Sequence, residues 1–142
     1  MAAAQCSRTI LLIDDDDDYR EALALMFEVS GYRVRCAGNG RDGVRMAAEE
    51  PPDAILLDFL MPVMNGPETS RRLRALSALR DVPILALTAF GRRPDELDGA
   101  GLDFSGSDIQ GYLEKATEPE ALIERVASAI AALASAQGRE HP

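Results

Sequence analysis

The chain has 142 residues, 46% of them hydrophobic and 27% charged, which is typical of a single soluble globular domain. The net charge of −9 argues against nucleic acid or an anionic membrane as a direct partner, because both bind basic surfaces. No apolar run reaches the roughly 18 residues of a membrane span and no signal-peptide pattern opens the chain, so we expect a cytoplasmic protein.

Short apolar runs alternate with segments of helical period in the first half of the chain. They predict a strand at 9–14, a helix at 17–30, a strand at 32–37, a helix at 40–50 and a strand at 53–59. Leu23 and Phe27, four residues apart, mark the buried face of the first helix, and Gly31 predicts its end. The continuous apolar run at 53–59 (DAILLDF) is typical of a central parallel strand.

The same alternation continues through the second half of the chain. It predicts a turn at 61–66, a helix at 67–79, a strand at 82–89, a short strand at 111–115 and a long amphipathic helix at 118–136. Residues 90–110 are the least regular, because Pro94, Gly99, Gly101 and Gly106 interrupt them. We expect one short helix at 94–98 in this stretch, followed by a loop.

This alternation of strands and helices predicts an α/β fold with a parallel sheet and helices on both faces. In such sheets, ligands bind at the carboxyl ends of the strands. The polar residues predicted at those ends are Asp14, Asp15, Asp58, Thr88 and Lys115.

Three carboxylates at one edge of a sheet repel one another unless a cation lies between them. Mg²⁺ is the natural candidate, because Mg²⁺ prefers oxygen ligands and also binds water and phosphate oxygens. Mn²⁺ is an alternative. Lys115 adds a positive charge and Thr88 a hydroxyl, as a site that stabilises a phosphoryl group requires. Asp58 is therefore a candidate nucleophile that forms an aspartyl phosphate.

Four motifs, in this order and at these spacings, resemble the receiver domains of bacterial two-component response regulators: LLIDDDDDYREAL, ILLDFLMPVMNG, LALTA and GYLEKATEPEAL. The resemblance covers residues 9–136 and leaves tails at 1–8 and 137–142. It implies a flavodoxin-like (βα)5 three-layer sandwich with the sheet order 2-1-3-4-5.

The resemblance also implies a metal site. Asp14 and Asp15 are its acidic pair, Asp58 is both phosphoacceptor and metal ligand, and the backbone carbonyl of Leu60 completes the protein ligands. The three following aspartates, 16–18, lie where the first helix begins. We expect them to cap that helix and to face solvent.

Around the phosphoryl group, the resemblance implies that Thr88 and Lys115 bind its oxygens and that Tyr112 is the aromatic switch residue. Leu60 and Phe90 lie two residues beyond Asp58 and Thr88, at positions that bear on the attack of water. Apolar side chains at both positions predict a long-lived phosphoryl state.

Two features depart from the family pattern. Ala116 stands where the family has a proline after the lysine, and the loss of that proline predicts a looser loop before the last helix. The segment between Thr88 and Tyr112 is longer and richer in glycine, which predicts a short or irregular fourth helix. The two cysteines form no disulfide framework or zinc motif, and we expect Cys6 in a tail and Cys36 as a small buried hydrophobic residue.

The function that the resemblance implies is a phosphorylation-controlled switch rather than a turnover enzyme, with slow loss of the phosphoryl group. A sensor histidine kinase or a histidine phosphotransfer protein is the expected donor, because the only histidine of this chain is His141 in the tail. The face of the fourth helix, fifth strand and fifth helix (92–136) is expected to bind an unknown output partner or a second copy. The chain is either a stand-alone receiver or part of a longer protein.

Three other classes of protein fit the residues less well. An aspartate-nucleophile phosphatase needs a second aspartate two residues after the nucleophile, where this chain has Leu60. A degenerate receiver that only binds partners would lack the lysine, the hydroxyl or one of the acids. An FMN carrier needs a hydroxyl- and glycine-rich phosphate loop after the first strand, where five aspartates would repel the phosphate.

Overall fold

The computed structural model describes residues 8–61, 64–88 and 109–139. Within these ranges, five parallel strands form one sheet in the order β2-β1-β3-β4-β5, which confirms the expected topology. In chain order the elements are β1 (Thr9–Ile13), α1 (Asp17–Val29), β2 (Arg33–Ala37), α2 (Gly40–Glu49), β3 (Ala54–Asp58), α3 (Gly66–Arg74), the 3₁₀ helix η2 (Ser77–Leu79), β4 (Ile84–Thr88), β5 (Gly111–Glu114) and α5 (Pro119–Arg139).

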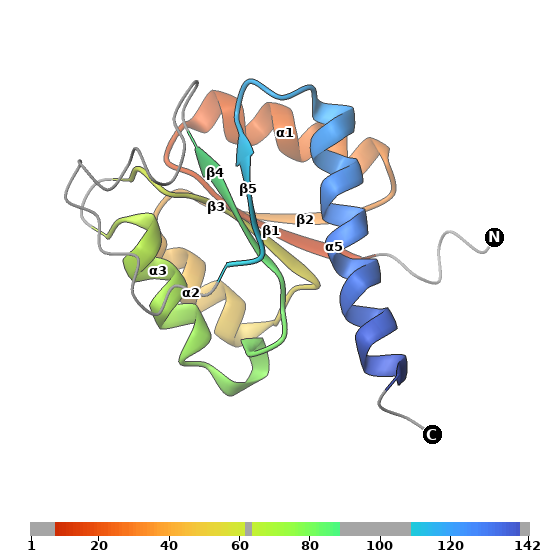
Figure 1. The fold of residues 1–142 in the computed structure, drawn as a ribbon. Coiled ribbons are helices and arrows are strands. Elements are labelled where there is room, and N and C mark those ends of the chain that lie inside the picture. The colour runs from red at the N-terminus through yellow and green to blue at the C-terminus, as the bar shows by residue number, and fades with distance from the viewer. Residues whose placement is uncertain (1–7, 62–63, 89–108, 140–142) are drawn as a thin grey trace.

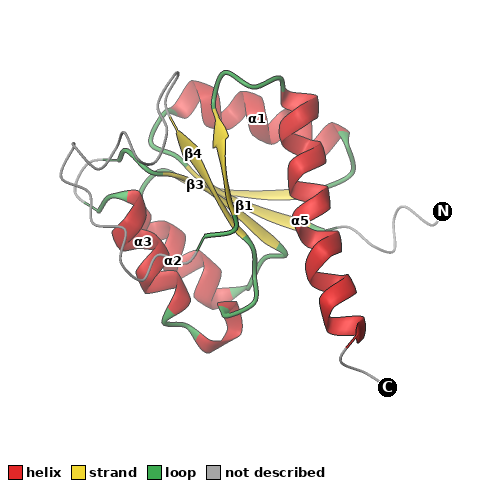
Figure 2. Cartoon of the chain, viewed as in Figure 1, coloured by secondary structure: helices red, strands yellow, loops and turns green. Residues whose placement is uncertain are grey.

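Helices cover both faces of the sheet and make three layers, as expected for a flavodoxin-like fold (Figures 1 and 2). α1 and α5 lie on one face, and α2 and α3 lie on the other. Along β1, Ile10 and Leu12 pack toward α1 and α5, whereas Leu11 and Ile13 pack toward α2 and α3. All four side chains are buried, which is why this strand is a continuous apolar run in the sequence.

The parallel register brings the carboxyl ends of the strands to one edge of the sheet. The pairs nearest this edge are Ile13 with Leu57, Asp58 with Leu87 and Thr88 with Glu114. Asp14 directly follows β1 and Lys115 directly follows β5, so both extend the same edge. The polar residues predicted at the strand ends therefore come from neighbouring strands.

Side-chain caps fix where three helices begin. Asp16 accepts from the Tyr19 N–H in α1, Asn39 from the Asp42 N–H in α2, and Asn65 from the Glu68 N–H in α3. The cap predicted from the aspartate run is thus confirmed at Asp16, and Asp17 and Asp18 are exposed in the first turn. At the other end of α1, Gly31 has a φ of +100°, a conformation that glycine adopts without strain.

The predicted helix at 67–79 is interrupted. α3 ends at Arg74, and Leu76 has an extended backbone (φ −84°, ψ 120°) before the short η2. The Arg74 guanidinium donates to three backbone carbonyls between Leu79 and Val82, at 2.7–3.2 Å. These hydrogen bonds stabilise the turn that replaces the last part of the predicted helix.

The expectation that Cys36 is buried is wrong. β2 is an edge strand, and although Val34 packs against the core, Cys36 is exposed. At the C-terminal end of the chain, α5 runs to Arg139, past the predicted end at residue 136. The apolar stripe expected on this amphipathic helix is buried at Leu122, Val126 and Ile130, whereas Leu133, its fourth member, is only half-buried.

The helix expected at 94–98, and with it the expected irregular fourth helix, lies outside the described residues. Of the helices that the structure describes, none combines the length and the apolar character needed to cross a bilayer.

Candidate functional site

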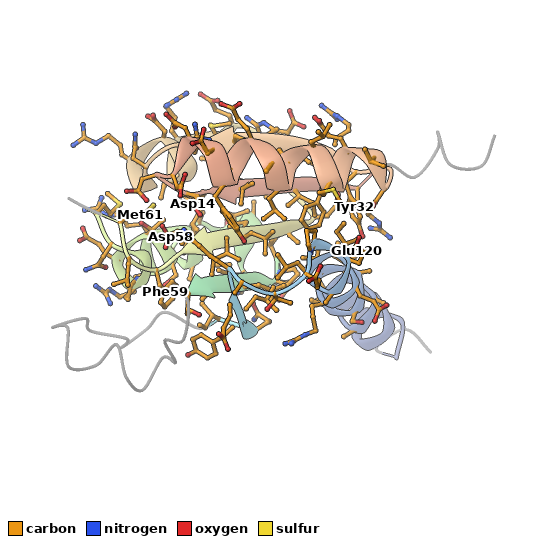
Figure 3. The ribbon with its side chains drawn as sticks, turned by 90° about the horizontal axis from the view of Figure 1, so that it is seen from above. Asp14, Tyr32, Asp58, Phe59, Met61 and Glu120 are labelled. Atoms are coloured by element: carbon orange, nitrogen blue, oxygen red, sulfur yellow. The ribbon has the colours of Figure 1, made fainter. Side chains whose placement is uncertain are left out.

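Polar side chains lie at one end of the sheet, at or just after the ends of four strands. Asp14 follows β1, Asp58 ends β3, Thr88 ends β4 and Lys115 follows β5. Figure 3 shows Asp14 and Asp58 close together at this end, beside Phe59 and Met61. The structure therefore brings together the residues that the sequence placed at strand ends, and it does so through the register of the sheet.

Lys115 lies between the two buried carboxylates. Its Nζ is 2.8 Å from Asp14 Oδ2 and 3.3 Å from Asp58 Oδ2. Asp14 is 0% exposed and Asp58 is 3% exposed, so both would be costly as unpaired charges. Each acid also accepts a hydrogen bond from the backbone two residues later: the Asp16 N–H donates to Asp14 Oδ1 at 2.9 Å, and the Leu60 N–H donates to Asp58 Oδ1 at 3.1 Å.

A third carboxylate completes an acidic cluster. Asp14, Asp15 and Asp58 each offer one oxygen, and these oxygens lie within 4.8 Å of one another. Asp15 is exposed, so the cluster is open to solvent on one side. An all-oxygen donor set of this size suits a hard divalent cation such as Mg²⁺, which keeps several water ligands. The residues present thus fit the metal that the sequence predicted.

The environment of Asp58 disfavours its charged form. Burial, followed by the negative charge of Asp14, raises the pKa of Asp58 to about 7, although the Leu60 N–H and Lys115 act in the opposite direction. Burial alone would lower the pKa of Lys115, but its contacts with Asp14 and Asp58 outweigh that effect and raise it. Lys115 therefore stays protonated, and the cluster has an excess of negative charge that another cation would relieve.

Thr88 lies on β4, the strand next to that of Asp58, and Tyr112 lies on β5, one strand further away. Thr88 is buried, and its hydroxyl donates a long hydrogen bond of 3.4 Å to the Leu113 carbonyl. Tyr112 is 41% exposed, and its ring packs edge-to-face against Phe59 with 6.5 Å between centroids. In this structure the predicted switch tyrosine thus faces outward, and the threonine hydroxyl is directed to β5.

The residues predicted to affect phosphoryl lifetime are only partly described. The Leu60 side chain is 38% exposed, two residues beyond Asp58. Phe90 lies outside the described residues. The metal-ligand role of the Leu60 carbonyl stays a prediction. Ala116 is exposed in the turn after β5, where the Thr117 N–H donates to the Glu114 carbonyl at 2.9 Å.

Two residues of the site escaped the sequence reasoning, Tyr19 and Arg20. Lys115 Nζ lies 4.9 Å from the centroid of the Tyr19 ring. Arg20 Nη1 donates to the Asp14 carbonyl at 2.7 Å, and Arg20 Nη2 pairs with Asp17 at 2.6 Å. Both residues lie near the start of α1. The i,i+3 spacing of Asp17 and Arg20 is a local signal for that ion pair, whereas no local signal links Tyr19 to Lys115.

Comparison with known proteins points to one family. Residues 10–127 match the family described as "Response regulator receiver domain". Among curated relatives, the transcriptional regulatory protein AfsQ1 of Streptomyces coelicolor is 40% identical over 119 residues, which are 83% of this chain and 49% of that protein. The phosphate regulon transcriptional regulatory protein PhoB of Pseudomonas aeruginosa is 34% identical over 119 residues, 84% of this chain and 50% of that protein. The chain thus spans about half the length of the curated relatives it matches.

Solved structures agree with this match. The receiver domain of the sensor histidine kinase PA1611 of P. aeruginosa, which has a magnesium ion coordinated in its active-site cleft, superposes with a TM-score of 0.78 at 30% identity, over 89% of this chain and 99% of that one. The chemotaxis protein CheY4 of Vibrio cholerae gives a TM-score of 0.77 at 27% identity, over 87% of this chain and 99% of that one.

Proposed function

The chain belongs to the response regulator receiver domain family, and we propose that it accepts a phosphoryl group on Asp58 from a sensor histidine kinase or a histidine phosphotransfer protein. The observation that carries the proposal is the position of Lys115, which contacts the buried Asp14 and Asp58 at 2.8 and 3.3 Å. A lysine that holds a nucleophilic carboxylate can also neutralise charge that develops on a transferred phosphoryl group.

In the transfer step, a carboxylate oxygen of Asp58 attacks the phosphorus of the donor's phosphohistidine. A phosphorus–oxygen bond forms, the phosphorus–nitrogen bond breaks, and the imidazole nitrogen leaves with the electron pair of that bond. The product is an acyl phosphate, which water later hydrolyses back to Asp58 and inorganic phosphate. The chain is therefore a phosphoacceptor rather than a turnover enzyme.

The residues that would hold Mg²⁺, or Mn²⁺ in its place, are Asp14, Asp15, Asp58 and the backbone carbonyl of Leu60. When bound, the ion supplies positive charge that offsets the carboxylates and the phosphoryl oxygens. The Leu60 N–H contributes separately, since its hydrogen bond to Asp58 Oδ1 fixes the orientation of that carboxylate.

Phosphorylation would then act as a switch through Thr88, Lys115 and Tyr112. The Thr88 hydroxyl has a hydrogen bond of 3.4 Å to the Leu113 carbonyl, long enough to be exchanged for a phosphoryl oxygen at little cost. Tyr112 is partly exposed and could turn inward as the threonine moves. Such a movement would shift an existing equilibrium between inactive and active forms and change the face at 92–136.

The output of this switch is proposed to be protein binding. Several curated relatives are named as transcriptional or DNA-binding regulators, but the net charge of −9 argues against direct nucleic-acid contact by this chain. An output protein, or a second copy bound through β5 and α5, is the partner that the family suggests. Leu60, together with Phe90, would slow hydrolysis by excluding water from the acyl phosphate.

Intact mass after incubation with Mg²⁺ and acetyl phosphate tests the proposed function. The wild type should gain one phosphoryl group, and Asp58→Asn should gain none. Asp81→Asn, which changes an exposed aspartate outside the cluster, should behave like the wild type. Phosphorylation of Asp58→Asn to the same level as the wild type would show that the phosphoacceptor is a different residue.

A further inference from the structure

Tyr19, on α1, contacts the lysine of the site. It lies in the first turn of α1, where its backbone N–H donates to the capping Asp16 at 3.1 Å. The cap fixes the start of the helix and thereby the direction of the Tyr19 side chain. The ring then presents its face to Lys115, with Nζ at 4.9 Å from the centroid, within the range of a cation–π contact.

The hydroxyl of Tyr19 does not explain this position of the ring. Its oxygen is buried and has no hydrogen-bond partner among the described residues. A buried tyrosine hydroxyl usually finds a partner, because it can both donate and accept, and leaving it unpaired is unfavourable. The ring therefore lies where its face meets the ammonium group, although its hydroxyl finds no partner there in the described part of the chain.

Tyr19 and Lys115 also line one cleft of about 330 Å³ between α1 and the turn that follows β5. The buried Leu23 and Leu122 form part of its wall. The Lys115 side chain is 21% exposed, and it reaches from this cleft to Asp14 and Asp58. One side of its ammonium group thus faces carboxylates and another faces an aromatic ring.

These two kinds of contact respond differently to ligands. A divalent cation at the acidic cluster would neutralise part of the charge on Asp14 and Asp58 and so weaken the ion pairs that hold Lys115. The Tyr19 ring carries no charge, and its attraction for an ammonium group does not depend on those carboxylates. A lysine has a flexible stem with several rotatable bonds, so a neutral contact of this kind restricts where its charge can lie.

We propose that Tyr19 is a positioning residue of the phosphoryl-transfer site, whose ring keeps Lys115 over Asp58 when a metal ion and a phosphoryl group are bound. This inference rests on the proposed function. The aromatic ring, and not the hydroxyl, is the group that acts. Tyr19→Phe is therefore the matched control for Tyr19→Leu.

A structural measurement tests the contact without any phosphorylation. In ¹H–¹³C NMR spectra of the full chain, the Lys115 ε-methylene protons should show an upfield ring-current shift with and without Mg²⁺. The shift should persist in Tyr19→Phe and disappear in Tyr19→Leu. An unshifted Lys115 signal in the Mg²⁺-bound wild type would overturn the inference, whatever the outcome of the phosphorylation test.

A double-mutant cycle of phosphorylation rates tests the role of Tyr19 in phosphoryl transfer. With Mg²⁺ and acetyl phosphate, Tyr19→Leu should slow phosphorylation of Asp58 by about fivefold to thirtyfold, the range that a partly desolvated cation–π contact provides, and Tyr19→Phe by less than about twofold. In a Lys115→Met background, Tyr19→Leu should cause no further loss, because its effect passes through the ammonium group. If Tyr19→Leu slowed phosphorylation equally in the wild-type and Lys115→Met backgrounds, its role would be merely structural. If Tyr19→Phe slowed phosphorylation as much as Tyr19→Leu, the effect would belong to the hydroxyl. Either result overturns the proposal.

Discussion

Lys115 Nζ lies 2.8 Å from Asp14 Oδ2 and is closer to this acid than to Asp58, at 3.3 Å. The lysine thus partly neutralises the more buried carboxylate, while Asp58 carries the raised pKa. One positive charge for two buried negative charges leaves the metal-free site unbalanced. The excess of buried negative charge therefore lowers the stability of the metal-free chain.

The first consequence is a dependence of stability on pH. The pKa of Asp58 rises from 3.8 to about 7 on folding, so the folded chain binds more protons than the unfolded chain between these values. Without Mg²⁺, the contribution of Asp58 to the free energy of unfolding should be greatest below pH 3.8 and should be lost as pH rises through 7. Asp58→Asn should remove this dependence and stabilise the metal-free protein at pH 7.5 by roughly 2–4 kcal/mol.

Urea denaturation of both proteins in EDTA, at pH 5 and pH 7.5, measures this difference. The increase in the free energy of unfolding caused by Asp58→Asn should be smaller at pH 5 than at pH 7.5. Asp81→Asn is the control, since Asp81 is exposed and lies outside the cluster. Its stability should differ between pH 5 and pH 7.5 by as much as that of the wild type. A gain from Asp58→Asn that does not change with pH would contradict the assigned cause.

Mg²⁺ should stabilise the folded chain through the acidic cluster. Saturation at 100 times the dissociation constant should add about 2.7 kcal/mol to the free energy of unfolding, because the unfolded chain has no preformed site. Asp15→Asn should weaken this effect without loss of metal-free stability, since Asp15 is exposed. Thermal unfolding across a Mg²⁺ titration measures this stabilisation. If Mg²⁺ stabilised Asp15→Asn as much as the wild type, Asp15 would not be a metal ligand.

Arg20 should stabilise the backbone that carries Asp14, one of the proposed metal ligands. Its guanidinium donates to the Asp14 carbonyl at 2.7 Å and is mostly buried, so Arg20→Met should lower the free energy of unfolding by about 1–3 kcal/mol. The variant should also weaken Mg²⁺ binding, because the backbone that positions Asp14 is less restrained. Isothermal titration with Mg²⁺, together with urea denaturation, measures both effects.

Arg45→Met is the matched control for Arg20. Arg45 also pairs with acids on its own helix, Asp42 and Glu49, but all three side chains are about half exposed. Such surface pairs contribute about 0–1 kcal/mol, so Arg45→Met should change stability little and Mg²⁺ affinity not at all. Equal effects of the two variants would show that burial beside Asp14 is unimportant.

Gly66 should be required for the strand end that carries Asp58. A Cβ atom at this position would lie 2.4 Å from the Phe59 Cα and 2.3 Å from its ring, and the backbone cannot yield as a flexible side chain can. Gly66→Ala should therefore destabilise the chain by at least roughly 2 kcal/mol. Gly38→Ala is the control, since its Cβ would meet only the tip of Arg20 at 3.5 Å.

The two glycine variants are compared by urea denaturation at one pH in EDTA. Gly38→Ala should remain within about 1 kcal/mol of the wild type. If Gly66→Ala were equally well tolerated, the close packing between the start of α3 and Phe59 would not be a constraint on this end of β3.

The amino-acid sequence alone was sufficient for the fold class and for the residues at the strand ends. Apolar runs of strand length and the 3.6-residue period are local signals, so they could predict the alternation of strands and helices without coordinates. The sheet order and the roles of Asp14, Asp58, Thr88 and Lys115 came from motifs that resemble a known family. Local capping chemistry also predicted that the aspartates at 16–18 cap the first helix, which the structure confirms at Asp16.

Only the tertiary structure decided which groups face one another and which face solvent. Cys36 is exposed because β2 is an edge strand, and the helix after Gly66 stops at Arg74, whose guanidinium binds the carbonyls of the next turn. Tyr19 meets Lys115 across 96 positions of sequence only because α1 packs beside the end of β5. The exposure of Cys36 and the Tyr19 contact depend on segments far apart in the chain, and the end of α3 depends on how one side chain folds over the next turn. The period of a local sequence pattern carries no information about either.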